Sequence, residues 1–109
     1  MKLPRFLQRL KNRRLVVLRR VMGDSMSPML VPGNVVLGVW PRRIAAGDVV
    51  IVRHGGLDKI KRVANLRQNE IFLTGDNYLQ STDSRDFGWL EHTTIVAKVV
   101  WPKVKRTEN

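Results

Sequence analysis

The chain has 109 residues, of which 43% are hydrophobic and 27% charged, and its formal net charge is +11. This size and composition are typical of one small globular domain, and they exclude a multidomain enzyme or a disordered tail. The absence of cysteine excludes a disulfide framework, a zinc knuckle, an iron–sulfur cluster and a cysteine nucleophile.

The positive charge is concentrated at the N-terminus. Residues 1–20 contain eight basic side chains and no acidic one, whereas the other 89 residues have a net charge of only +3. We expect residues 1–14 to form a basic arm or short amphipathic helix, because apolar residues recur at helical spacing: Leu3, Phe6, Leu7 and Leu10. Its basic face is either solvated or contacts an anionic membrane or an acidic partner.

The apolar run that follows, Leu15 to Leu18, ends at Arg19 and Arg20. A signal-peptide core needs roughly 7–15 apolar residues and a membrane-spanning helix about 20. We therefore expect no transmembrane segment, and we place the folded domain at residues 15–109.

From residue 15 onward, short segments rich in Val and Ile alternate with turn-forming Gly, Pro, Asp and Asn. Candidate strands cover residues 15–21, 34–40, 48–53, 59–66, 70–74 and 94–101. Six short strands in so few residues predict an all-β fold, a small coiled or barrel-like antiparallel sheet.

Several catalytic templates are absent. The sequence contains no Gly-x-Ser-x-Gly elbow, no Ser-x-x-Lys and no glycine-rich phosphate loop. His54 and His92 have no metal-ligand spacing, and we interpret both as loop or surface residues.

One serine has an informative position. Ser25 directly follows the first candidate strand and lies in the segment Gly23 to Leu30, where a hydroxyl points away from the sheet. Serine needs a base to act as a nucleophile, and a neutral lysine can supply it. Strand alternation puts Lys59, Lys61 and Val63 on one face. These lysines are either solvated strand residues or, where buried, amines with a lowered pKa.

Four segments resemble the conserved boxes of the type I signal peptidase family of serine–lysine peptidases, in that family's order. Ser25 to Leu30 resembles its Ser-Met-x-Pro-x-Leu box, and Gly47-Asp48 its Gly-Asp strand. Lys61-Arg62-Val63 resembles the Lys-Arg box, and residues 75–88 the Gly-Asp-Asn…Ser-x-Asp-Ser-Arg box. The Gly-Asp-Ser-Met start is also similar to that of self-cleaving repressors, but those lack the last box.

The resemblance implies a role for each matching residue. Ser25 would be the nucleophile, and the Lys61 amine its general base. Ser81 would orient that amine, and Gly75 would keep the adjoining wall narrow. Asp83 and Arg85 would form an ion pair that supports the site. No cofactor or metal is implied.

The sequence departs from the family pattern beside the nucleophile. Many signal peptidases have a serine two positions before it that helps to stabilise the oxyanion, and Gly23 stands there in this chain. The oxyanion would then depend on the Ser25 backbone N–H and a second donor that the sequence does not identify. Asp24 would raise the pKa of Lys61 if it faced inward, so we expect it to point outward.

The sequence shows neither the membrane anchor nor the second region that true signal peptidases carry. Among the relatives, it most resembles the compact nickel-type superoxide dismutase maturation proteases. The resemblance implies a cytoplasmic serine endopeptidase that removes the N-terminal leader of a protein precursor, the nickel superoxide dismutase precursor in that case.

Two alternatives remain open at this point. One is a general leader protease at the inner membrane surface, with residues 1–14 as a peripheral anchor. The other is a basic nucleic-acid-binding β domain. The +8 arm motivates it, but the few aromatic residues offer no stacking platform. We therefore expect no nucleic-acid partner.

Overall fold

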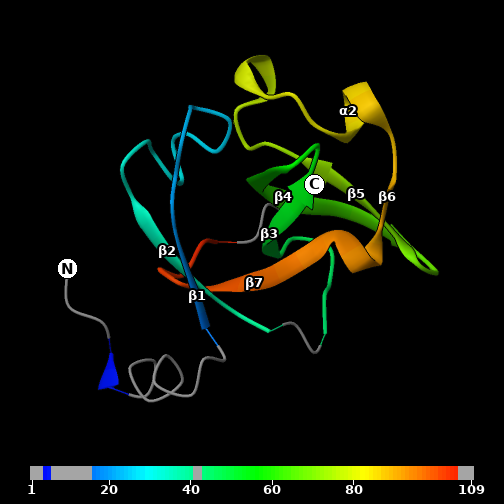
Figure 1. The fold of residues 1–109 in the computed structure, drawn as a ribbon. Coiled ribbons are helices and arrows are strands. Elements are labelled where there is room, and N and C mark those ends of the chain that lie inside the picture. Colours follow the sequence, from blue (N-terminus) through cyan, green and yellow to red (C-terminus); the bar gives the residue numbers. More distant parts are fainter. Residues whose placement is uncertain (1–3, 6–15, 41–42, 106–109) are drawn as a thin grey trace.

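The computed structural model of the protein describes residues 4–5, 16–40 and 43–105 (Figure 1). The helix or arm predicted for residues 1–14 lies outside the described residues, apart from Pro4 and Arg5. Within the described ranges, no helix is both long enough and apolar enough to span a membrane.

One antiparallel sheet of seven strands makes up most of the described chain (Figure 1). In their order across the sheet, the strands are β1 (Val16–Arg20), β2 (Val35–Val39), β7 (Ile95–Trp101), β3 (Val49–His54), β4 (Leu57–Arg67), β5 (Glu70–Thr74) and β6 (Leu90–Glu91). Three short helical turns, η1 (Tyr78–Gln80), α2 (Ser84–Phe87) and η2 (His92–Thr94), lie between strands. The predicted all-β antiparallel fold is confirmed.

All six predicted strands are present, with ends within two residues of the predicted ones. The sequence analysis missed β6, which has two residues and pairs with β5 only through Glu70–Glu91 and Ile71–Leu90. A strand of two residues has no alternation to detect. Its pairing depends on the approach of two segments that are distant in the sequence.

The central strand β3 explains where the core lies. Four successive residues of β3 are buried, because alternate side chains enter two different hydrophobic clusters on its two faces. The first cluster contains Val21, Met26, Leu30, Val36, Val49, Ile51 and Ala97. The second contains Val50, Val52, Val63, Ile71, Leu73 and Ile95.

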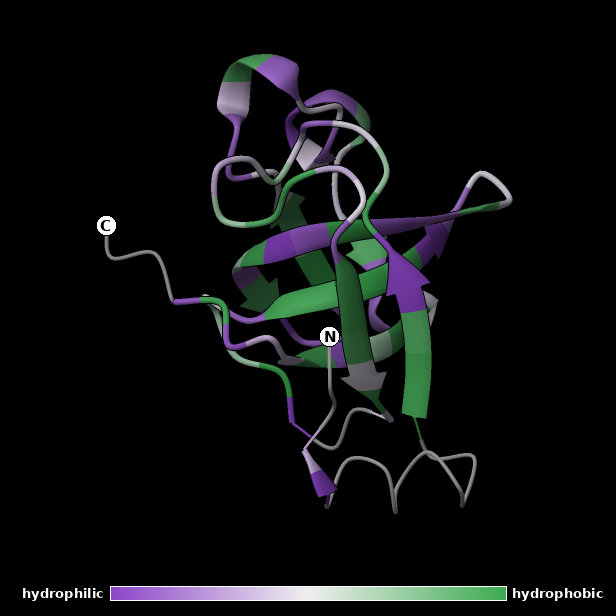
Figure 2. Cartoon of the chain, turned by 90° about the vertical axis from the view of Figure 1, so that its left-hand side faces the viewer, coloured by the Kyte–Doolittle hydropathy of each residue, from purple (hydrophilic) through white to green (hydrophobic). Residues whose placement is uncertain are grey.

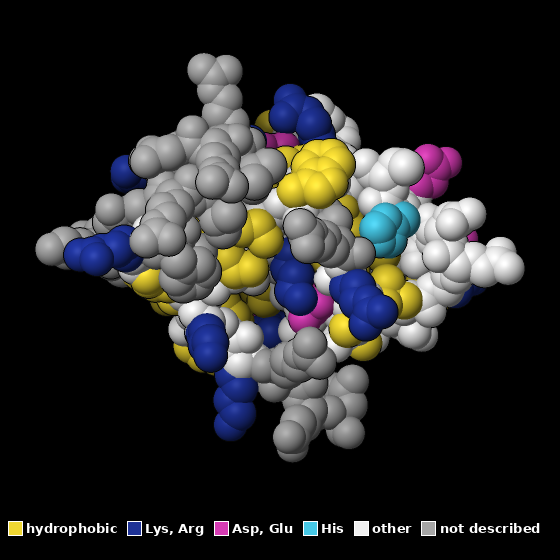
Figure 3. Space-filling model, turned by 90° about the horizontal axis from the view of Figure 1, so that it is seen from below, with side chains coloured by type: hydrophobic (Ala, Val, Ile, Leu, Met, Phe, Trp, Pro, Cys, Tyr) yellow, Lys and Arg dark blue, Asp and Glu magenta, His cyan; other side chains and the backbone are white. Residues whose placement is uncertain are grey.

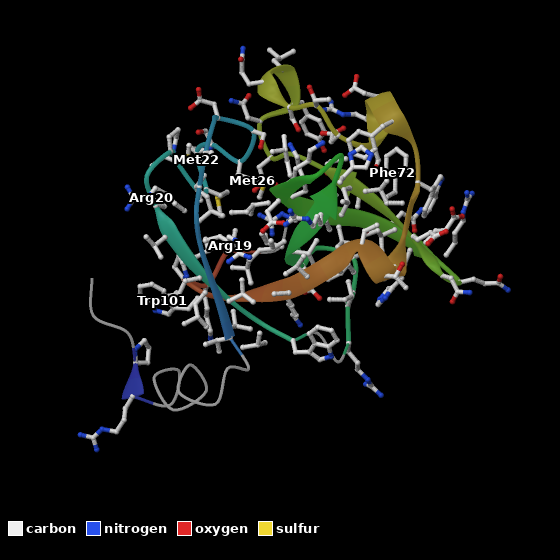
Figure 4. The ribbon with its side chains drawn as sticks, in the orientation of Figure 1. Arg19, Arg20, Met22, Met26, Phe72 and Trp101 are labelled. Atoms are coloured by element: carbon white, nitrogen blue, oxygen red, sulfur yellow. The ribbon has the colours of Figure 1, made fainter. Side chains whose placement is uncertain are left out.

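The sheet coils so that its end strand β1 reaches the β3–β4 hairpin. Arg19 Nε on β1 lies 2.7 Å from Asp58 Oδ2, and Arg53 Nη1 lies 3.1 Å from Asp58 Oδ1. Figure 2 shows β1 as a hydrophobic strand with a hydrophilic end, and Figure 4 shows Arg19 pointing from this end toward the centre of the molecule. The ion pair therefore joins two strands that are not neighbours in the sheet.

Basic side chains are dispersed over the lower face of the molecule. In Figure 3 the Lys and Arg residues drawn in colour are separated by hydrophobic, uncharged and acidic ones. The coloured part of this face thus shows no continuous basic surface of the kind that binding to a phosphate backbone favours.

Candidate active site

The loop after β1 contains Ser25 and lies at the top of the molecule as drawn in Figure 1. Val21, Met26 and Leu30 anchor this loop in the first core cluster, whereas Met22 is 80% exposed. Figure 4 shows Met22 and Met26 on this loop. Ser25 is half-buried between these anchors, and Asp24 is exposed, so the Asp24 side chain points outward.

Asn77 holds the Ser25 loop from the opposite side, and the sequence analysis assigned it no role. Its backbone N–H donates to the Ser25 carbonyl at 2.8 Å, and its side-chain Nδ2 donates to the Asp24 carbonyl at 3.1 Å. The signal available in the sequence was its place in the Gly75-Asp76-Asn77 box. Which backbone it would contact is decided only when the chain folds.

Lys61 lies in the middle of β4, opposite Val50 of β3, and is only 5% exposed. Its Nζ donates a hydrogen bond of 3.0 Å to Ser81 Oγ. Burial lowers the pKa of the Lys61 amine, because the charged form loses hydration. The Asp83 carboxylate opposes this shift, and the cations of Lys59 and Arg85 reinforce it.

Asp83 is fully buried and organises the polar groups behind Lys61. It accepts hydrogen bonds from Ser81 Oγ at 2.7 Å, from the Gly75 N–H at 2.8 Å and from Arg85 Nε at 2.9 Å. Burial by itself would raise the pKa of Asp83, but the hydrogen bonds from Arg85, Gly75 and Ser81 outweigh it and hold the pKa well below its usual range. Asp83 therefore remains a carboxylate. By accepting the hydrogen bond of the Ser81 hydroxyl, it orients this hydroxyl so that the oxygen lone pairs of Ser81 face the Lys61 amine.

Gly75 occupies the point where the segments of Ser25 and Ser81 meet. A Cβ atom at this position would collide with Ser81 Oγ and would come within 2.5 Å of the Ser25 carbonyl oxygen. The close approach of these groups thus requires a glycine.

Ser25 and Lys61 line the same pocket. Residues from the end of β1, Arg20 to Met22, and residues of β4, Asp58 to Ile60, also line it. Among the described residues, Lys61 Nζ donates to Ser81 and makes no hydrogen bond to the Ser25 hydroxyl. Hydrogen bonds of this kind are often long in ligand-free sites and tighten when substrate binds.

The backbone beside Ser25 contains one unused donor. The Ser25 N–H makes no hydrogen bond to the described residues. Gly23 has a φ of +77°, a conformation that a serine would adopt only with strain. The glycine two positions before Ser25 is therefore required by the local backbone, and a second side-chain donor at this position is disfavoured.

A buried ion pair next to the pocket was not singled out from the sequence. Arg62 Nη2 and Nε lie 2.6 and 3.0 Å from the Asp76 carboxylate, and Arg62 Nη1 donates to the Gly47 carbonyl. The two side chains are only 4% and 9% exposed. The pair fastens β4 to the segment that carries Gly75 and Asn77. Both residues lie inside recognised boxes, yet only the fold shows that they meet.

The two histidines lie elsewhere. His92 is exposed in η2, and His54 is half-buried at the end of β3. Neither lines the pocket of Ser25. Among the described residues, no three His, Asp or Glu side chains gather in an arrangement that could hold a metal ion.

The coiled sheet thus brings the serine after its first strand and a buried lysine to one pocket. The family model described as Peptidase S24-like matches residues 2–100. The chain belongs to the peptidase S24-like family. A search of curated proteins finds no match.

Proposed function

We propose that the protein is a serine endopeptidase in which Ser25 is the nucleophile and Lys61 the general base. The observation that carries this proposal is a buried lysine amine, with a lowered pKa, in the same pocket as a serine at a loop. Family membership supports the peptidase class, and the geometry around Lys61 supports the residues.

In the proposed reaction, neutral Lys61 takes the hydroxyl proton of Ser25 as the Ser25 oxygen attacks the scissile carbonyl carbon. The tetrahedral intermediate then loses its C–N bond, and the Lys61 ammonium protonates the leaving amine. Water attacks the acyl-enzyme with Lys61 again taking a proton. The ester bond breaks and Ser25 regains its proton.

Groups around the dyad have supporting roles in this proposal. Ser81 holds the Lys61 amine through its 3.0 Å hydrogen bond, and Asp83 with Arg85 holds Ser81. The Ser25 N–H has no partner among the described residues, and in this proposal it donates to the developing oxyanion. Preorganised donors of this kind stabilise the charge that forms in the transition state.

An extended peptide backbone can be bound between two strand edges. β1 is the end strand and pairs only with β2, and residues 57–61 of β4 pair with β3 on one side, because β5 pairing starts at Arg62. Both segments border the pocket of Ser25. Addition of a peptide strand would satisfy these backbone groups and hold the scissile bond open to attack.

The substrate we propose is the N-terminal leader of a protein precursor, and the resemblance of the boxes to compact maturation proteases favours the nickel superoxide dismutase precursor. The proposed setting is the cytoplasm. A general leader protease at the inner membrane face is the second candidate. It is favoured by large exposed apolar side chains on the loops near Ser25: Met22, Met29, Val31, Tyr78 and Leu79.

The test is incubation of the full chain with a nickel superoxide dismutase precursor, and mass spectrometry of the new N-terminus. We expect a single cut that removes the leader, and no cut with Ser25→Ala protein. Cleavage restricted to a membrane-anchored precursor in vesicles would instead support the second candidate. Failure to cut either precursor would contradict both.

The pH dependence of cleavage tests the role of Lys61. Because burial lowers the pKa of Lys61, its neutral form should predominate from a pH below the value of about 10.4 for a free lysine. We expect the rate to rise with pH and to level off before about pH 10.4. A rate that still rises above this pH, while the protein remains folded by circular dichroism, would contradict the assignment.

A further inference from the structure

Lys59 is a second lysine beside the pocket of Ser25, and the proposed reaction gives its side chain no contact with the substrate. It lies two residues before Lys61 on the same face of β4, and it lines the same pocket. Its charge also acts on the Lys61 amine, as expected for a neighbour along the strand. The pocket thus extends from the proposed dyad along β4 to a cation.

The Lys59 ammonium makes no ion pair with any described residue. The adjacent Asp58 is occupied by Arg19 on one carboxylate oxygen and by Arg53 on the other. Asp86 on α2 accepts a backbone hydrogen bond from Asp83. The polar partner of Lys59 is His54 Nδ1, at 3.0 Å, and a neutral imidazole can accept this bond without cancelling the charge.

The same cation is held in place by aromatic groups. Lys59 Nζ lies 5.1 Å from the centre of the Phe87 ring, within the range of a cation–π contact. The His54 and Phe87 rings also contact each other in a tilted arrangement, with centroids 4.3 Å apart. Because these contacts restrict the lysine before a ligand arrives, little conformational entropy is lost when an anion binds to it.

Strand geometry relates Lys59 to the scissile bond. Two residues of a strand span about 6.6–6.8 Å, and side chains two apart share a face. An extended peptide beside β4, with its reacting carbonyl at Ser25 and Lys61, would place a side chain two residues away near Lys59. The matching side chain for an uncompensated ammonium is a carboxylate.

We propose that Lys59 is a specificity-determining residue that selects substrates with Asp or Glu two residues from the scissile bond, on the side that runs along β4 toward the hairpin. This inference rests on the proposed peptidase function. His54 and Phe87 act as positioning residues for the Lys59 amine.

The test is digestion of a proteome-derived peptide mixture by the full chain, with all cut sites identified by mass spectrometry. We expect Asp and Glu to be enriched about fivefold at one of the two positions that lie two residues from the cut, the size of a partly shielded ion pair. Lys59→Gln should abolish the enrichment, and Lys59→Glu should replace it by a preference for Lys and Arg. Lys59→Arg should retain it.

The matched control is Arg43→Gln, which removes an exposed cation from the connection between β2 and β3, outside the residues that line the pocket; it should leave the enrichment unchanged. Circular dichroism melts identify any variant that does not fold. Ser25-dependent cuts without acidic enrichment, or with the same enrichment in Lys59→Gln and Lys59→Glu, would overturn this inference and leave the peptidase function intact. Absence of any Ser25-dependent cut would overturn the peptidase function itself.

Discussion

We expect Ser25→Ala to lower the rate of precursor cleavage by about 10⁴- to 10⁶-fold, the loss typical of removing the nucleophile from a serine peptidase. The thermal midpoint should stay unchanged, because the Ser25 hydroxyl makes no hydrogen bond to the described residues. Initial rates at saturating precursor measure the loss of cleavage, and a circular dichroism melt measures the thermal midpoint.

Lys61→Met is the companion change, and we expect a loss of rate of the same order, since Ser25 and its base act as one unit. We expect the same change to leave the stability of the fold unchanged or to raise it. The pKa of Lys61 is lower in the folded protein than in the unfolded chain, so the contribution of Lys61 to stability rises with pH between these two values and is least favourable below the folded value. A methionine has a similar volume and no charge, so it removes the free-energy cost of burying the charged amine.

We therefore expect Lys61→Met to melt at or above the wild-type temperature near pH 6, and this advantage to shrink as the pH approaches about 10.4. The control is Lys98→Met, because Lys98 is 32% exposed beside Asp48 and its replacement should give no such gain. Cleavage that survives in Lys61→Met, or a marked loss of stability near pH 6, would contradict the assignment of a buried, neutral base.

Asp76→Ala should reduce the free energy of unfolding by about 3–5 kcal/mol, the cost of leaving one charge of a buried pair without its partner. The guanidinium of Arg62 is 4% exposed and would retain its hydrogen bond to the Gly47 carbonyl. That bond carries no compensating charge. Cleavage should also fall, because Asp76 holds the segment of Gly75 and Asn77 against the Ser25 loop. Urea unfolding measures the stability, and the precursor assay measures the rate.

The matched control for this change is Glu70→Ala. Glu70 pairs with Arg67 at 3.0 Å, but these side chains are 39% and 57% exposed, so the loss should be below about 1 kcal/mol. Equal losses of unfolding free energy in Asp76→Ala and Glu70→Ala would show that burial does not determine how much the Arg62–Asp76 pair stabilises the fold.

The strands were the most predictable part of this protein. Segments such as Val49 to Val52 and Ile95 to Val99 combine β-branched residues with bounding turns, and these are local signals. β6 could not be predicted in this way, because two residues have no period. A coiled sheet was expected from the short strands, but the Arg19–Asp58 ion pair was not, because the two residues are far apart in the sequence.

The residues of the candidate site could be predicted from the sequence, but their burial could not. The box order singled out Ser25, Lys61, Ser81, Asp83 and Arg85, and the structure places the last four in one chain of hydrogen bonds, with Ser25 in the pocket of Lys61. Alternation correctly put Lys59 and Lys61 on one face, but it could not tell a solvated amine from a buried one.

The sequence by itself determined the strands, the turns and the residue types available for chemistry, because period, turn composition and motif order are properties of neighbouring residues. Only the tertiary structure decided that Lys61 is buried, that Arg62 meets Asp76 and that Asn77 holds the Ser25 loop. Desolvation of an amine depends on atoms supplied by distant segments, here β3 and the residues around Ser81, and no local pattern records how closely those segments pack.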